Sequence, residues 1–218
     1  MKIEGMKFRN RRIEWSVAVR AFAAGLVFAI VMSLCGFNLN YNSIRENVLR
    51  LHILANSDSI EDQALKLKVR DAVLEASPEI FEGVLTEDEA VKAAKEKIEL
   101  IKLTAEKVIL DEGYYYPVTV EIGQTYFDKR VYDDFTLPAG NYEAVRILIG
   151  NGQGKNWWCV MFPSVCVPAA SKREDVSSVL TNKQNDMIKN PSKYKARFKV
   201  VEFFDYLQNK IAKISKKF

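Results

Sequence analysis

The chain has 218 residues, of which 48% are hydrophobic and 11% aromatic, so it can build one globular domain with additional segments or two small domains. Its single histidine, His52, excludes multi-histidine metal sites, and its three cysteines lack the spacing of a zinc site. The net charge is +4, but residues 1–20 carry +4, residues 193–218 carry +6 and the 172 residues between them carry −6. This distribution argues against a nucleic-acid-binding protein, which carries its positive charge on a folded face.

An apolar run from Ala21 to Phe37, broken only by Ser33, follows a basic N-terminus. As a helix its 17 residues span about 26 Å, and a start at Val17 lengthens it because Arg20 can extend its charge to the interface. The positive-inside rule keeps the N-terminus in the cytoplasm and exports residues 38–218. We therefore predict a basic cytoplasmic segment (1–16), a signal peptide or transmembrane anchor (17–37) and a linker (38–47).

Whether the apolar segment is a cleaved signal peptide or an uncleaved anchor stays open. Val31-Met32-Ser33 is an acceptable cleavage site, but the Ala-x-Ala pattern is absent. Cys35 follows Leu34, where a lipoprotein signal requires a small residue. A buried core helix is the third interpretation, and the charge asymmetry disfavours it.

The exported part begins with alternating residues at Val48–Leu54, which predict a half-buried strand with Leu49, Leu51 and Ile53 inward and Arg50 and His52 outward. Ser59 and Asp62 resemble a capping box and predict a helix. Its apolar stripe is Leu65, Val69, Ala72 and Ala76, and it ends near Pro78. One further helix is predicted from its Thr86 and Glu89 cap to about Gly113.

Three more strands are predicted downstream. Tyr116–Ile122 and Glu143–Ile149 alternate, whereas Trp157–Phe162 is unbroken and apolar, as in a strand covered on both faces. This order of elements predicts an α+β domain at 48–168 with a mostly antiparallel sheet packed by helices. A polar connection (169–198) and a basic amphipathic C-terminal helix (199–218) follow.

Charged residues gather near the first strand, and they allow two interpretations. His52 with Asp58 or Asp62 could form a general acid–base site. Helix caps and ion pairs on a solvated helix face explain the same residues, and we favour this second interpretation. The glycine-rich stretch 150–154 precedes a strand and not a helix, so a hairpin loop is favoured over a phosphate-binding loop.

The adjacent Trp157 and Trp158 point to opposite faces of their strand. One can fill the core, while the other packs under a helix or serves as an interface anchor. Cys159 and Cys166 lie in the exported part with Pro163 between them. They either close a small disulfide loop or remain two buried free thiols.

Five stretches resemble the stage II sporulation protein R family over about residues 45–168. They are LRLHILANSDS (49–59), DQ (62–63), LKLKVRDAV (65–73), LPAGNYEAVR (137–146) and GNGQGKNWWCVMFP (150–163). The resemblance implies a signalling protein of endospore-forming bacteria that is made in the forespore. It is exported to the space between the forespore and mother-cell membranes. There it activates a membrane-embedded aspartic protease that processes the precursor of sigma factor E.

The leading hypothesis is therefore an exported ligand that is not an enzyme and needs no cofactor, metal, nucleic acid or small-molecule substrate. Its predicted contacts with the protease are Arg50, His52, Asn56, Asp58, Gln63, Arg70, Gly150, Gly152, Gly154, Asn156, Trp157 and Trp158. Charge reversal at Arg50 or Arg70 is then expected to abolish signalling in a folded domain. The alternatives are a cell-wall hydrolase that uses His52 with a nearby Asp while Arg50 holds a substrate carboxylate, and a membrane-tethered adaptor.

Overall fold

The computed structural model describes residues 4–132, 134–165 and 175–203, and the chain divides into two units at Asn40/Tyr41. Helix α1 (Glu4–Arg45) contains the whole predicted apolar segment. Its part from Trp15 to Arg45, with a mean hydropathy of 2.2, is long and apolar enough to cross a membrane by length and composition. An N-terminal helix of this kind fits a signal sequence or a membrane anchor.

The predicted linker at 38–47 is wrong, because the helix continues to Arg45. Tyr41 and Ile44 are fully buried, and the Tyr41 hydroxyl donates a hydrogen bond to the Ala139 carbonyl. The second unit therefore begins before residue 48, and the last turn of α1 belongs to its core.

The second unit is built on a four-stranded sheet with the order β2-β5-β1-β6. The strands are β1 (Leu49–Leu54), β2 (Val118–Phe127), β5 (Gly140–Ile149) and β6 (Asn156–Phe162). β1 runs parallel to β5, and the β2–β5 and β1–β6 pairs are antiparallel. A separate two-stranded ribbon joins β3 (Arg130–Val131) to β4 (Thr136–Leu137). These pairings confirm an α+β fold with a mostly antiparallel sheet.

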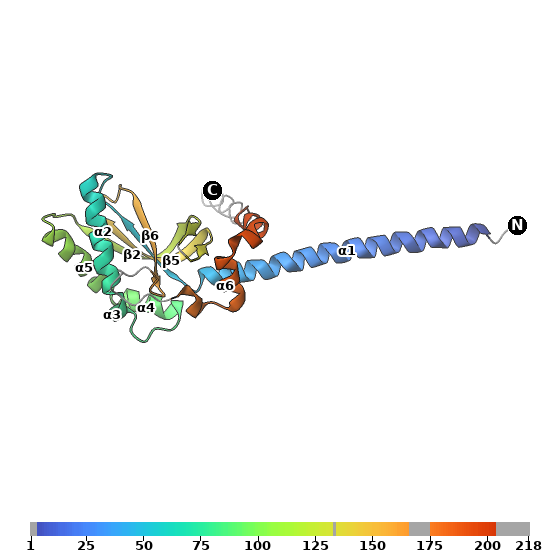
Figure 1. Ribbon diagram of the computed structural model, residues 1–218, viewed down its shortest axis with the longest axis horizontal. Coiled ribbons are helices and arrows are strands. Elements are labelled where there is room, and N and C mark those ends of the chain that lie inside the picture. The colour runs from blue at the N-terminus through green and yellow to red at the C-terminus, as the bar shows by residue number, and fades with distance from the viewer. Residues whose placement is uncertain (1–3, 133, 166–174, 204–218) are drawn as a thin grey trace, which may run out of the picture. The chain divides into compact units, whose positions relative to one another are not determined.

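Four helices pack against one face of the sheet, and α2 and α5 lie along it in Figure 1. They are α2 (Ile60–Glu75), α3 (Ser77–Ile80), α4 (Glu87–Glu96) and α5 (Ile98–Asp111). Ser59 caps α2 through the Asp62 N–H, and Thr86 and Glu89 form the predicted capping box of α4. The single helix predicted from Thr86 to Gly113 is wrong, because the chain breaks at Lys97 into α4 and α5.

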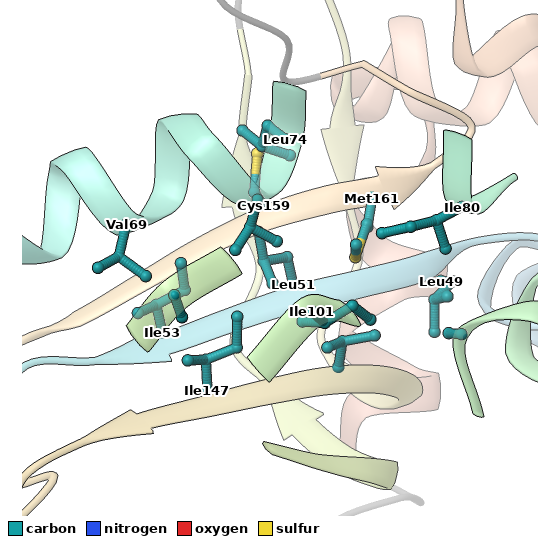
Figure 2. Close-up of a cluster of buried hydrophobic side chains, with 14 of the residues drawn as sticks. Leu49, Leu51, Ile53, Val69, Leu74, Ile80, Ile101, Ile147, Cys159 and Met161 are labelled. Carbon is teal, nitrogen blue, oxygen red and sulfur yellow. The ribbon is translucent and has the colours of Figure 1, made fainter. Parts of the chain in front are cut away.

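The core lies between these helices and the sheet, as Figure 2 shows for Val69 and Leu74 of α2 opposite Leu51 and Cys159. Leu51 and Ile53 are fully buried, as predicted from the alternation of β1. Burial of such side chains supplies about 1.5–3 kcal/mol each, so this layer dominates the stability of the unit.

The prediction that β1 is half-buried is wrong. Arg50 is fully buried and His52 is 5% exposed, because aromatic side chains from β2, β5 and β6 cover the second face. The opposite error affects β6, an edge strand in which Trp157 and Trp158 are only half-buried and Asn156 is exposed. Full burial on β6 begins at Cys159.

The segment after residue 174 is more ordered than the polar connection predicted for 169–198. It forms η1 (Val176–Val179), α6 (Asn182–Lys189) and η2 (Pro191–Tyr194), and residues 195–203 are helical. Thr181 and Gln184 build a capping box, and Met187 and Ile188 are fully buried. Residues 204–218, which make up most of the predicted C-terminal helix, lie outside the described residues, as does Cys166.

Candidate functional site

Arg50 sits at the centre of the second sheet face, inside a cluster of aromatic rings. Its guanidinium carbon lies 3.9 Å from the ring centre of Phe127 and 4.9 Å from that of Tyr142. One terminal nitrogen, Nη2, donates to the Tyr132 hydroxyl at 2.7 Å, while Nη1 is buried without a partner among the described residues. Burial lowers the pKa of Arg50, yet no described carboxylate pairs with it. Cation–π contacts with two rings replace the counter-ion.

His52 lies one step along the same face. Its ring stacks on Trp158 with centres 3.8 Å apart, and Nε2 hydrogen-bonds with Asn156 Oδ1 at 2.9 Å. Burial lowers the pKa of His52 to about 4, so the imidazole is neutral at neutral pH. Both features hold Trp158 and the start of β6 against β1.

A polar clamp joins the turn after β1 to the glycine-rich loop before β6. The amide of Asn56 accepts a hydrogen bond from the Asn151 N–H at 3.0 Å and donates one to Asp62 at 2.9 Å. Burial alone raises the pKa of Asp62, but hydrogen bonds from Ser57 and Asn56 outweigh it and hold that pKa below its usual range. Gly150 has φ +57°, and a Cβ there would lie 2.3 Å from Asn56 Oδ1.

Two more hydrogen bonds hold Lys155 of the loop before β6, one from the turn after β1 and one from α2. Asp58 accepts from the Lys155 N–H at 2.7 Å, and Lys66 donates to the Lys155 carbonyl at 2.9 Å. Gly154 is buried, and a Cβ at this position would lie 2.1 Å from the Ser57 carbonyl oxygen. The glycine-rich stretch is thus a loop that admits close backbone approach, in agreement with its interpretation as a hairpin loop.

Arg70 and Trp157 form a more accessible pair on the edge of the sheet. The Arg70 guanidinium carbon lies 4.4 Å from the centre of the indole ring, and Arg70 pairs with Asp71 at 2.6 Å. The Arg70 side chain is 20% exposed and Trp157 is half-buried. Of the predicted contact residues, Asp58 and Asn156 are exposed, whereas Arg70 and Trp157 are half-buried, as are Asn56, Gln63, Gly150, Gly152 and Trp158.

The partner-binding face stays a prediction, and three of its residues, Arg50, His52 and Gly154, are buried in this structure. Asn56 and Gln63 are partly buried and are used inside the clamp, Gln63 by donating to the Ser57 carbonyl at 2.8 Å.

The hydrolase alternative is not favoured by this arrangement. His52 Nε2 faces an amide and not a carboxylate, while Asp58 and Asp62 accept hydrogen bonds from other groups. Arg50 is enclosed by rings and cannot hold a substrate carboxylate. Within the described ranges, no group of three or more His, Cys, Asp or Glu side chains is placed to hold a metal ion.

A family model described as stage II sporulation protein R matches residues 45–172, more than half of the chain. The chain belongs to the stage II sporulation protein R family. A curated stage II sporulation protein R of Bacillus subtilis (strain 168) is 38% identical over 133 residues, which cover 61% of this chain and 59% of that protein. The chain therefore matches less than two thirds of this relative's length. No solved structure matches the chain.

The matched region contains all of β1, the clamp, the aromatic cluster and the Arg70–Trp157 pair. Sequence analysis missed Phe127, Tyr132 and Tyr142, which enclose Arg50. A signal was present for Tyr142 alone, since it lies in the stretch 137–146 that resembles the stage II sporulation protein R family. Phe127 lies beyond the predicted strand 116–122, because β2 continues to that residue.

Proposed function

We propose that this chain is an exported signalling protein that activates a membrane-embedded aspartic protease. Activation triggers processing of the sigma factor E precursor during sporulation. The observation that carries the proposal is membership of the stage II sporulation protein R family over residues 45–172. The apolar helix supports export, either to the forespore membrane or, after cleavage, to the space between the forespore and mother-cell membranes.

The mechanism is a shift in the population of protease states. A ligand activates only by binding the active state more tightly than the inactive one. We assign the contact to the surface around Arg70 and Trp157, together with the neighbouring Asn156 and Asp58. Trp and Arg dominate the binding energy of protein interfaces, and here one side chain of each type is held in place by the other.

The test is co-expression of the candidate protease and the sigma precursor in a non-sporulating host, with and without this chain. Precursor size on a gel is the readout. Cleavage is expected only when the chain is present, and cleavage without it or none with it contradicts the proposal.

Surface variants test the assigned contact in the same assay. Arg70→Glu and Trp157→Ala are expected to reduce processing by about tenfold or more, because each removes a central side chain of the contact. Lys92→Glu, on the 78%-exposed Lys92 side chain of α4, is the matched control and should process normally. Normal processing by both Arg70→Glu and Trp157→Ala would place the contact elsewhere.

A further inference from the structure

A pocket of about 590 Å³ in the second unit is lined largely by acidic and polar side chains. Its walls come from the end of α1, the start of α4, β2 and the first residues of β5. Four carboxylates line it, and the guanidinium of Arg45 is the positive group among its described lining residues. The carboxylates are Glu46, Glu87, Asp88 and Glu143.

Glu87 is the feature of this pocket that the fold does not account for. Its side chain is only 8% exposed, yet it makes no hydrogen bond or ion pair within the described residues. A mostly buried carboxylate without a partner loses part of its hydration, and this disfavours its charged form. Local violations of this kind are typical of functional or strained sites.

Glu143 supplies a second unsatisfied oxygen to the same pocket. Its Oε1 accepts a hydrogen bond from Gln124 Nε2 at 2.8 Å, whereas Oε2 is buried without a partner. Two carboxylates with unused acceptor capacity thus line one pocket from α4 and β5.

The position of Glu87 at the N-terminus of α4 does not explain its burial. A helix N-terminus favours carboxylates, and Glu89 shows the expected result, since its hydrogen bonds to the N–H groups of Leu85 and Thr86 lower its pKa. Glu87 behaves in the opposite way. Burial, followed by the charges of Asp88, Glu143 and Glu46, raises its pKa to about 7, against the opposing charge of Lys95.

We infer that this pocket binds a basic side chain, arginine or lysine, of the partner protein. A guanidinium or ammonium group would donate to the Glu87 carboxylate, which has no partner among the described residues, and to Glu143 Oε2, which is buried without one. Tyr126, which is 51% exposed, also lines the pocket. Asn42 and Glu46 come within ten residues after Phe37, the last residue of the apolar run, so on an uncleaved chain the partner meets them close to the membrane surface.

This inference rests on the proposed function only because it names a protein as the source of the cation. Binding of a basic peptide to the pocket can be tested without the protease. The full chain, labelled with ¹³C at the glutamate carboxyl carbons and held in neutral detergent, is titrated with acetyl-Gly-Arg-Gly-amide. The lysine peptide is a parallel arm. The peptide with neutral citrulline in place of arginine is the control, and Ca²⁺ is a competing cation.

The carboxyl resonances of Glu87 and Glu143 are expected to move with the basic peptides and not with the citrulline peptide. Glu143→Gln should weaken binding by about tenfold, as expected for loss of one charge-assisted hydrogen bond. Glu99→Gln, on the exposed part of α5, should leave binding unchanged. The inference would be overturned if the carboxyl resonances shift equally with the arginine and citrulline peptides. It would also be overturned if Glu87 and Glu143 shift no more than Glu99, or if they shift with Ca²⁺ alone.

Glu87→Gln separates a binding role from a structural one. Because Glu87 repels its acidic neighbours, we expect this variant to be at least as heat-stable as the wild type at pH 8 while it binds the basic peptides more weakly. Lower stability together with unchanged binding would show a structural role. In the co-expression assay, a wild-type chain that binds the peptide but triggers no processing contradicts the proposed function alone, whereas processing without peptide binding contradicts the pocket alone.

Discussion

Arg50 is a buried cation that depends on rings and one hydroxyl group in place of a carboxylate. Arg50→Glu puts a negative charge against the faces of Phe127 and Tyr142, so we expect a loss of about 3–5 kcal/mol in the free energy of unfolding. Arg50→Met keeps the apolar stem and should cost only about 1–2 kcal/mol, mainly for the unpaired Tyr132 hydroxyl. Urea unfolding of the full chain in detergent measures both. Equal stability of the two variants would show that the cluster does not need the positive charge.

His52 makes the stability of the domain depend on pH in one direction. Its pKa falls from 6.5 in the unfolded chain to about 4 in the fold because it is buried, so the unfolded state takes up the proton first. Its contribution is therefore complete above pH 6.5 and is lost as the pH falls toward 4. We expect His52→Phe, which keeps a ring on Trp158, to gain in thermal unfolding temperature relative to the wild type over that range and to run parallel to it above pH 7. Parallel curves at all pH values would show that His52 does not change its charge on unfolding.

Glu87 makes stability depend on pH in the opposite direction to His52. Its pKa rises from 4.5 to about 7 on folding, so the contribution of its protonated form is complete below pH 4.5 and is lost as the pH rises through 7. Glu87→Gln should therefore become more stable relative to the wild type as the pH rises from 5 to 8. The thermal unfolding temperature, followed by circular dichroism across that range, is the measurement. A difference that does not depend on pH would mean that Glu87 ionises normally in the fold.

At the scale of elements, the clamp between the turn after β1 and the loop before β6 can be tested by two glycines of similar conformation. Gly150 (φ +57°) and Gly152 (φ +60°) both strain an added side chain, but only at Gly150 would the Cβ collide with Asn56. At Gly152 the nearest atom to that Cβ is a Leu148 methyl carbon at 3.4 Å. Gly150→Ala should therefore destabilise the domain by about 1–3 kcal/mol more than Gly152→Ala. If urea unfolding shows the same loss of unfolding free energy for both variants, Asn56 moves away from the added methyl group without destabilising the domain.

The alternation of apolar and polar residues predicted where the strands lie. It did not predict which side chains cover the other face of each strand. Alternation at Leu49–Leu54 correctly placed Leu51 and Ile53 in the core, because every second residue of a strand shares a face. It also suggested that Arg50 was exposed, because a single strand carries no information about rings supplied from residues 127–142. The break at Lys97, where the backbone leaves the helical conformation, was missed because the apolar spacing continues through it.

For the candidate site, the sequence picked out polar residues that make specific contacts in the structure. It did not predict which groups those residues contact. The stretches that resemble the family contain Asn56, Asp58 and Gln63. The structure uses Asn56 and Asp58 to join two loops, and Gln63 of α2 donates to the Ser57 carbonyl in the first of them. Partner-binding was expected of them because polar residues in a signalling protein are usually read as surface contacts. The Arg70–Trp157 pair stays a candidate because the structure leaves part of it accessible.

At the scale of the whole molecule, the predicted Cys159–Cys166 disulfide stays a prediction, since Cys166 lies outside the described residues. Cys159 is 1% exposed in the core. The proposed export, to an oxidising compartment, would favour the bond. We expect alkylation of the unreduced, denatured protein to label neither of the two cysteines, and mass spectrometry of the digested chain reads this out. Labelling of both would show that they are free thiols.

The central claim is that the chain acts from outside the cytoplasm by binding a membrane protease. The most direct measurement is sigma precursor size in the co-expression host for the wild type and for a chain whose export is blocked by Val27→Arg and Phe28→Arg. Both residues lie in the apolar helix, and two charges at its centre oppose insertion. The account predicts full cleavage with the wild type and none with the blocked chain, while both accumulate to the same level. Equal cleavage by a blocked chain that stays in the cytoplasm would contradict it.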